Sequence, residues 1–317
     1  MKAILAGSTL AALILAGPAA AFPDKPITII VPAAAGGPSD TVARLVAQSM
    51  GETLGQQVLV ENLGGAGGSL GAGQAARAAP DGYTLLLYHV GVATFSALYP
   101  QLPYEPTSDF SSVGLITEVP MAIVGRKDLP AADIAGLIEA LRGKEPLSFG
   151  TAGVGAVSDL CGMLLSDALG AEMVVVPYKG TGPAMTDLMG GQIDLMCDQT
   201  TNTANQIKGG EIKAYAVTTP ERIAILPDTP TLAESGLPGF EITAWHAIWA
   251  PAGTPEPVRE RLATALRTAL QEPAVIDRLA ALGTTPVAAD LATPAALDTR
   301  FQQEIARWGK LLAGAAN

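Results

Sequence analysis

The stretch ITIIVPAAAGGPSDTVAR, residues 27–44, decides the fold. Its first five residues are continuously apolar and mostly β-branched, which is typical of a strand buried on both faces of a sheet. A loop of alanine, glycine and proline follows, and the pattern beyond it predicts a helix over 39–54. Such a junction presents unpaired backbone N–H groups to an anion, although this loop contains no lysine or arginine. It therefore predicts an anion site built from the backbone alone.

The same alternation of strand and helix continues along the chain and predicts the α/β class. Expected strands lie at 27–31, 58–62, 84–88, 113–117, 121–125, 147–150, 173–177, 193–197, 214–218 and within 240–251. Expected helices lie at 39–54, 70–78, 131–142, 158–169, 182–190 and 202–208, with further helices after Thr254 and Thr293.

Two strand–helix series follow one another, and the chain then returns to the first. This order predicts two doubly wound α/β domains joined by a two-crossing hinge, with the crossings near 118–123 and 243–249. The expected domain one comprises 22–120 plus 247–317, and the expected domain two comprises 121–246. Because open α/β sheets bind ligands at the carboxyl ends of their strands, we expect the site between the domains.

The first 21 residues predict a secretory signal peptide, because Lys2 precedes a short apolar run that ends in small residues. We expect cleavage after Ala21. The apolar run is shorter than the roughly 20 residues that a membrane span needs. No later stretch is long and apolar enough to cross a bilayer, so the mature chain is expected to be soluble and exported.

Composition excludes several classes of partner. Without its first 21 residues, the chain carries 18 basic and 30 acidic side chains, a formal charge of −12. Nucleic acids and anionic lipids need basic surfaces, so neither is an expected partner. Cys161 and Cys197 fit a disulfide or two half-buried thiols, and their spacing decides neither. With His89 and His246 they match no usual zinc spacing, so we expect no metal.

Two glycine-rich stretches match enzyme motifs only formally. Residues 71–76, GAGQAA, fit the dinucleotide pattern, but the next strand ends without the acidic residue that would hold a ribose. We therefore expect no cofactor. Residues 67–71, GGSLG, fit the nucleophile elbow, but six residues separate Ser69 from the preceding strand, whereas the elbow needs its serine at the strand tip. A periplasmic serine esterase using Ser69 and His246 is kept as the alternative hypothesis.

A second junction resembles the first. SFGTAGVGAVSDL, residues 148–160, again reads as strand, glycine loop and helix, with Ser158 at the expected N-cap. Each helix start favours an anion by about 0.3–1 kcal/mol, and by up to about 2 kcal/mol when partly buried. One junction lies in each expected domain, so two such ends facing across a cleft would suit one or two carboxylates. Two ordinary glycine turns are the competing interpretation.

Seven stretches carry a family resemblance through their order and spacing. They are FPDKPITIIVPAAAGGPSD, GQQVLVEN with GAGG, AAPDGYTLLL, LPYEPTSDF, VPYKGTGPAMTDLMGGQIDLMCD, LPDTPTLAESGLPGFE and APAGTPEPV. The chain resembles the Bug-type periplasmic solute-binding receptors of tripartite tricarboxylate transporters along essentially its whole mature length. The resemblance implies a periplasmic binding protein-like fold, a periplasmic location, a monomer without enzymatic activity, and delivery of a small carboxylate to the membrane components of the transporter.

In this family one carboxylate is held by two glycine-rich loops, partly through ordered water. These loops match the two junctions, and Tyr178 and Asp198 also fall at cleft-facing positions. The competing interpretations are an N-cap for Asp198, and core packing with a solvated hydroxyl for Tyr178. The expected ligand-binding residues are Ala35, Gly36, Gly37, Ser39, Asp40, Tyr88, His89, Thr151, Ala152, Gly153, Val154, Gly155, Ala156, Val157, Ser158, Tyr178 and Asp198.

Departures from the family pattern bear on the ligand. Ala156 and Val157 replace small polar residues, Leu63 replaces an arginine, and Tyr88-His89 replaces a glycine followed by threonine or serine. We therefore expect a mono- or dicarboxylate with an apolar or aromatic body. His89 either meets a second carboxylate or packs at the rim. A sensor subunit that presents the liganded form to a signalling partner would share this fold and site, and the sequence does not separate it from a transport receptor.

Overall fold

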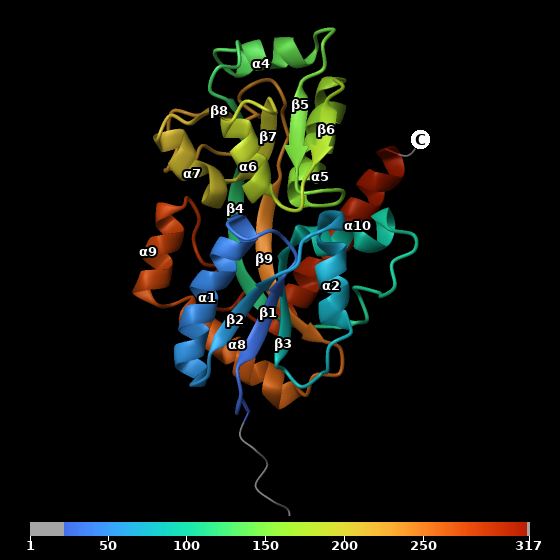
Figure 1. The fold of residues 1–317 in the computed structure, drawn as a ribbon, viewed down its shortest axis with the longest axis vertical. Coiled ribbons are helices and arrows are strands. Elements are labelled where there is room, and N and C mark those ends of the chain that lie inside the picture. Colours follow the sequence, from blue (N-terminus) through green and yellow to red (C-terminus); the bar gives the residue numbers. More distant parts are fainter. Residues whose placement is uncertain (1–21, 316–317) are drawn as a thin grey trace, which may run out of the picture.

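The computed structural model describes residues 22–315 (Figure 1). The expected signal peptide lies outside the described residues. Nine strands form one sheet in the order β2–β1–β3–β9–β4–β7–β5–β6, and β8 also pairs with β4. The strands are β1 (Ile27–Val31), β2 (Val58–Asn62), β3 (Thr84–His89), β4 (Phe110–Arg126), β5 (Ser148–Thr151), β6 (Val174–Pro177), β7 (Leu195–Gln199), β8 (Ile212–Val217) and β9 (Thr243–Pro251).

Helices cover this sheet, which confirms the predicted α/β class. The α-helices are α1 (Pro38–Leu54), α2 (Ser69–Ala76), α3 (Phe95–Leu98), α4 (Ile134–Leu141), α5 (Val157–Leu169), α6 (Thr181–Met189), α7 (Thr200–Lys208), α8 (Glu256–Ala269), α9 (Pro273–Ala281) and α10 (Pro294–Ala315). Two 3₁₀ turns, η1 (Ala66–Gly68) and η2 (Val90–Thr94), precede α2 and α3. Between residues 22 and 315, no helix combines the length and apolarity of a membrane span.

Two lobes are visible in Figure 1. Lobe one, the lower, holds β1, β2 and β3 with α1, α2, α8 and α9; lobe two, the upper, holds β5 to β8 with α4 to α7. The strands β4 and β9 run through the junction. Residues 110–120 of β4 pair with β9, whereas residues 121–126 pair with β7 and β8. The domain limits expected from the sequence stay predictions, and the change of partner between Pro120 and Met121 lies inside the expected first crossing.

Burial explains why the central strands form where they do. In β1 the side chains of Ile27, Ile29, Ile30 and Val31 are at most 1% exposed, as a strand covered on both faces requires. The helix α1 begins at Pro38, where a fixed φ and a missing N–H are tolerated. It ends at Leu54, and the C-cap Gly55 adopts a left-handed φ of 71°. The first expected strand and helix are therefore confirmed to within a residue.

One sequence expectation fails at the hinge. The strands predicted at 113–117 and 121–125 are a single 17-residue strand, β4, that continues through Pro120. Proline normally interrupts a ladder because it lacks an N–H. Here Pro120 lies opposite Thr243 at the end of the pairing with β9, where β4 changes partners. The proline therefore marks the change of partner and not a break in the strand.

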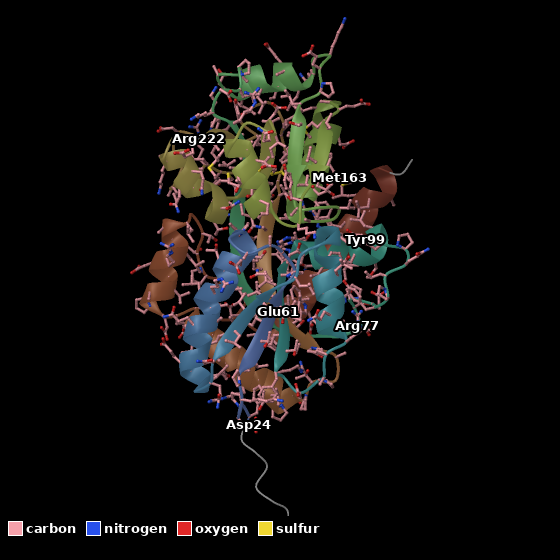
Figure 2. All side chains as sticks on the ribbon, viewed as in Figure 1. Asp24, Glu61, Arg77, Tyr99, Met163 and Arg222 are labelled. Atoms are coloured by element: carbon pink, nitrogen blue, oxygen red, sulfur yellow. A yellow bond between two sulfur atoms is a disulfide. The ribbon has the colours of Figure 1, made fainter. Side chains whose placement is uncertain are left out.

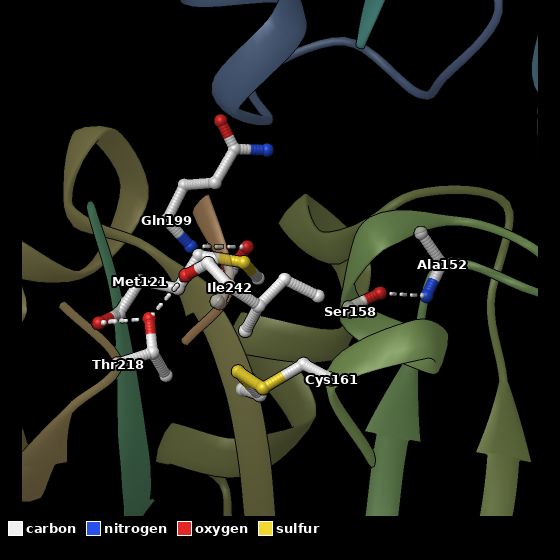
Figure 3. Close-up of a disulfide and its surroundings, with 9 residues drawn as sticks. Met121, Ala152, Ser158, Cys161, Gln199, Thr218 and Ile242 are labelled. Carbon is white, nitrogen blue, oxygen red and sulfur yellow. Dashed lines mark hydrogen bonds between the residues drawn. A yellow bond between two sulfur atoms is a disulfide. The ribbon is translucent and has the colours of Figure 1, made fainter. Parts of the chain in front are cut away.

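The two cysteines, left undecided by the sequence, form a disulfide. Cys161 of α5 and Cys197 of β7 are joined within lobe two, as Figure 3 shows. Both residues are fully buried. The bond ties the helix that follows the second glycine loop to the strand that leads into α7.

Candidate functional site

The loop between β1 and α1 forms the first half of the candidate site. Gly36 has a positive φ of 80°, and its N–H donates to Oδ2 of Asp40 at 2.9 Å. Gly37 is the N-cap of α1, and no side chain in the described part of the chain caps this helix. The first-turn N–H groups of α1 have no intrahelical acceptor, so this helix start can receive an anion.

The loop between β5 and α5 forms the second half. Gly155 has a φ of 78°, and its N–H donates to Oδ2 of Asp159 at 3.0 Å. Ala156 is the N-cap of α5, so the prediction of Ser158 at the N-cap is wrong by two positions. The Ser158 hydroxyl instead accepts the N–H of Ala152 at 2.9 Å, which closes the loop on itself. This helix start also has no side-chain cap among residues 22–315.

The two loops are copies of one local structure. Both carry Gly-x-x-Ser-Asp, at 36–40 and at 155–159, and both place the glycine N–H on the aspartate four residues later. The positive φ at the first position favours glycine. Sequence reasoning noted two similar junctions but missed this repeat, although the shared spacing was visible once the stretches were aligned.

The aspartates of the two loops differ in their electrostatics. Burial raises the pKa of Asp40, but hydrogen bonds from Arg44 and Gly36 outweigh it and hold the net pKa below its ordinary value. Arg44 Nε donates to Oδ2 of Asp40 at 3.0 Å. Burial likewise raises the pKa of Asp159, and the N–H of Gly155 offsets this only in part, so the net pKa is raised. In loop one, Arg44 therefore compensates the negative charge of Asp40. In loop two, burial disfavours the ionised form of Asp159.

The lobes touch through backbone groups beside these loops. The N–H of Ala34 in lobe one donates to the carbonyl of Lys179 in lobe two at 2.8 Å. The Tyr99 hydroxyl donates to the carbonyl of Val154 at 2.7 Å, and Figure 2 labels Tyr99 at the level where the lobes meet. A Cβ on Gly67 would overlap the same Val154 carbonyl. The structure is therefore a closed arrangement in which each glycine loop contacts the opposite lobe.

A hollow of about 730 Å³ lies at this lobe junction, and Tyr178 lines it together with Tyr99 and Val154. The Tyr178 hydroxyl donates to Oδ2 of Asp187 at 2.7 Å. Burial and this hydrogen bond raise the pKa of Tyr178 to about 12. Tyr178 thus lines this hollow, while its hydroxyl is bound within lobe two.

Two histidines lie on neighbouring strands beside loop one. His89, at the carboxyl end of β3, is paired in register with His246 of β9. His89 is only 4% exposed, and its Nδ1 accepts the N–H of Gly91 at 3.1 Å, so its proton is on Nε2. Burial, then the neighbouring His246, lowers the pKa of His89 well below its ordinary value. His89 is therefore a buried, neutral donor and does not pack at an exposed rim.

His246 contacts loop one directly. Its Nε2 lies 3.1 Å from the Ser39 hydroxyl, and burial lowers the pKa of His246 to about 3. The serine that reaches this histidine is thus Ser39 and not Ser69, which begins α2 and whose carbonyl accepts the Tyr104 hydroxyl. The pair required by the esterase hypothesis is not assembled.

Asp198 is the penultimate residue of β7, two residues before α7 begins. It is fully buried, and burial raises its pKa to about 6 against the hydrogen bonds that favour the ionised form. Its Oδ1 accepts the N–H of Gln199, and its Oδ2 accepts Nδ2 of Asn202 at 2.5 Å. The side chain therefore organises the start of α7 although Gln199 holds the N-cap position.

The side chains behind the expectation of an apolar or aromatic ligand are largely engaged in packing. Ala156 and Val157 are buried, and Val157 belongs to the main hydrophobic core. Leu63 packs against that core. Tyr88 is 1% exposed, and its hydroxyl donates to the carbonyl of Gly67 at 2.8 Å. The expectation stays a prediction that these side chains do little to support.

The sequence did not reveal three features of the lobe junction. They are Tyr99, the contact of His246 with Ser39, and Gln199. No local motif marks them, because each acquires its role through contacts with distant parts of the chain. Over the range 22–315, no group of three or more histidine, cysteine, aspartate or glutamate side chains is placed to bind a metal ion.

Two α/β lobes, two connecting strands and paired helix starts at their junction define the class of periplasmic solute-binding proteins. Solved structures agree with this architecture. BugD, a periplasmic binding protein, is 48% identical with a TM-score of 0.91, covering 93% of this chain and 99% of that one. MatC from Rhodopseudomonas palustris with bound malate is 41% identical with a TM-score of 0.89, covering 92% and 100%.

A third structure, an R. palustris protein with adipate, is 33% identical with a TM-score of 0.87 over 93% of this chain and 98% of that one. Among curated relatives, an Agrobacterium vitis protein described by its place in the TAR-I ttuE-ttuC' intergenic region is 66% identical, covering 93% of this chain and 85% of its own length.

The model of the tripartite tricarboxylate transporter family receptor matches residues 42–316. The chain belongs to this receptor family and is of the Bug type, which confirms the resemblance seen in the sequence.

Proposed function

We propose that this protein is a periplasmic receptor that captures a small dicarboxylate between its lobes and delivers it, as a monomer, to the membrane components of a tripartite tricarboxylate-type transporter. The observation that carries the proposal is the pair of Gly-x-x-Ser-Asp loops, one in each lobe, whose uncapped helix starts adjoin the lobe contact. The malate and adipate named for two neighbouring structures support the ligand class.

In this proposal the backbone N–H groups within 35–40 and 151–158 that are not already hydrogen-bonded inside their own loops bind one carboxylate. The Nε2–H of His89 is the candidate donor for the second carboxylate. A ligand that contacts both loops favours the closed arrangement by its differential contacts, so its affinity reports on closure. His89→Ala is then expected to weaken binding of a diacid much more than binding of its monoacid analogue, whereas equal losses would remove His89 from the site.

Thermal unfolding of the mature protein, first unfolded and refolded to remove any carried ligand, tests the proposal. The screen contains L-malate, adipate, citrate, acetate and benzoate. A ligand at about 100 times its dissociation constant adds about 2.7 kcal/mol to the free energy of unfolding, so binding is readily seen. Stabilisation by malate or adipate supports the proposal, and stabilisation by benzoate alone would favour the apolar-bodied ligand. No response to any carboxylate would overturn it.

Transport is tested separately. Deletion of the gene is expected to abolish uptake of the radiolabelled diacid that stabilises the protein, and the restored gene is expected to return it. Uptake that persists at the original rate would contradict the transport role while leaving ligand capture intact.

A further inference from the structure

The wall of the site in lobe one carries an uncharged polar pair, Ser39 and His246. Both are buried, at 2% and 0% exposure, and their Oγ and Nε2 atoms are 3.1 Å apart. His246 Nδ1 lacks a well-aligned hydrogen-bond partner within residues 22–315, although the nearby Ala244 backbone favours the protonated imidazole. Because the imidazole is neutral, it can either accept the Ser39 hydroxyl proton or donate to the hydroxyl oxygen. In the second case the Ser39 proton is free to be donated to a ligand.

The wall in lobe two carries a second set of uncharged polar groups, at the start of α7. Gln199 and Thr201 are buried, at 2% and 7% exposure. Gln199 Oε1 and Thr201 Oγ1 also lack partners in the described chain. Figure 3 shows the Gln199 side chain extending from its strand toward the blue ribbon of α1. A buried amide oxygen with no partner in its own lobe, directed at the other lobe, is available to accept a hydrogen bond from a ligand.

Contacts between neighbouring elements place the two walls close together. His246 lies opposite Thr117 of β4, and the Thr117 hydroxyl lies 2.7 Å from that of Thr284. The adjacent residue, Gly283, accepts the Thr200 hydroxyl at the start of α7. The helix α7 also contacts α1. These contacts link the Ser39 pair, through β4 and residues 283–284, to the start of α7, and we treat the linked groups as one polar region.

We infer that this region recognises a hydroxyl group on the carbon chain of a short dicarboxylate, so that a hydroxylated diacid is preferred over an unsubstituted diacid of the same length. The inference rests on the proposed function, because the two glycine loops are taken to hold one carboxylate. A cationic second wall would suit a further carboxylate, but these groups are uncharged and can both donate and accept. A hydroxyl has the same two capacities, so it matches them on either wall.

An unsubstituted diacid would leave these groups buried against methylene carbon. A buried polar group deprived of its partner costs about 1–3 kcal/mol, which corresponds to about 5- to 150-fold in affinity. Sites built to bind a hydroxyl reject analogues that lack it more strongly than apolar pockets reject an added group. The inference therefore predicts strong discrimination between diacids of equal length.

Isothermal titration of the refolded mature protein tests this with a graded series. Succinate, malate and tartrate have the same four-carbon frame and carry no, one and two hydroxyls, and both enantiomers of the chiral acids are used. We expect the better malate enantiomer to bind at least about tenfold more tightly than succinate. We expect adipate to be weaker than malate by a similar factor.

Two variants with matched controls assign the effect to the two walls. Ser39→Ala and Gln199→Leu are each expected to reduce the malate-to-succinate preference at least about fivefold. Ser49→Ala and Gln206→Leu remove unpartnered groups from the same two helices, outside the region defined here, and are expected to leave the preference unchanged. Thermal unfolding of all four variants verifies that each one folds.

The outcomes separate this inference from the proposed function. Failure of every diacid to bind would overturn both. Equal binding of succinate and malate would overturn the hydroxyl inference and leave the receptor proposal standing. A preference that survives in both Ser39→Ala and Gln199→Leu would also overturn the inference, because the recognising groups would then lie elsewhere.

Discussion

The two glycine loops share a backbone and differ in charge. In lobe one the aspartate of the Gly-x-x-Ser-Asp loop is paired with Arg44, whereas in lobe two the pKa of the equivalent Asp159 is raised by burial. Asp198, near the start of α7 in lobe two, also has a raised pKa. The shared geometry positions N–H groups equally well in both loops. The charge environment is therefore set by each lobe separately. Ionising the carboxylates costs more free energy in lobe two than in lobe one.

The largest expected effect concerns the contact between Val154 of loop two and Gly67 of lobe one. Gly67→Ala places a Cβ on the Val154 carbonyl at a positive φ of 59°, so the closed contact cannot form. We expect the malate dissociation constant, measured by titration, to rise about a thousandfold, equivalent to about 4 kcal/mol. Gly55→Ala, with a φ of 71° in open space, is the matched control and should bind normally. Normal binding by Gly67→Ala would show that this contact is absent from the bound form.

The next effect tests the cost of a buried carboxylate in lobe two. Since the folded pKa of Asp198 is raised to about 6, its stabilising contribution is present in acid and is lost as the pH rises toward 6. Urea unfolding of Asp198→Asn and wild type at pH 4 to 7 should show the variant gaining up to about 3 kcal/mol relative to wild type over that range. A difference that does not change with pH would mean that Asp198 is not buried as an acid.

A smaller effect of opposite sign is expected in lobe one. The lowered pKa of Asp40 means that its contribution is present at neutral pH and is lost as the pH falls through the folded pKa. Asp40→Asn should lower the free energy of unfolding at pH 7 by about 1–2 kcal/mol, a modest loss because the Arg44 side chain is 55% exposed. A double-mutant cycle with Arg44→Gln isolates the pair. Additive losses would show that the pair is not coupled.

The smallest effect completes the comparison. Asp159→Asn keeps an oxygen that can accept the Gly155 N–H and removes a buried charge that no close cation offsets in the residues described. We expect a change within about 1 kcal/mol, stabilising at pH 7 and fading at pH 4, as read by urea unfolding. A loss as large as that of Asp40→Asn would mean that the two loops are electrostatically alike.

Local sequence determined much of this fold and less of its site. The strand at 27–31 and the following helix start could be predicted because burial periodicity, Pro38 and Gly55 are local signals. The continuity of β4 could not be predicted, because a proline such as Pro120 indicates a break in a strand unless the change of strand partner is known. The contact between Ser39 and His246 joins residues 207 positions apart, so no motif reports it. The role of Gln199 is likewise visible only in the folded structure, where its side chain extends toward α1 of lobe one.

The passage of the chain through β4 and β9 has a consequence for assembly. Every strand unique to lobe two, and both cysteines, lie in the single run between these two strands, so this lobe can be completed while the C-terminal part is still being made. The other lobe must wait, because β9 sits between β3 and β4 and is among the last elements synthesised. Until it inserts, the nascent chain exposes two unpaired edges in the middle of its sheet, which makes this interval the one most open to aggregation.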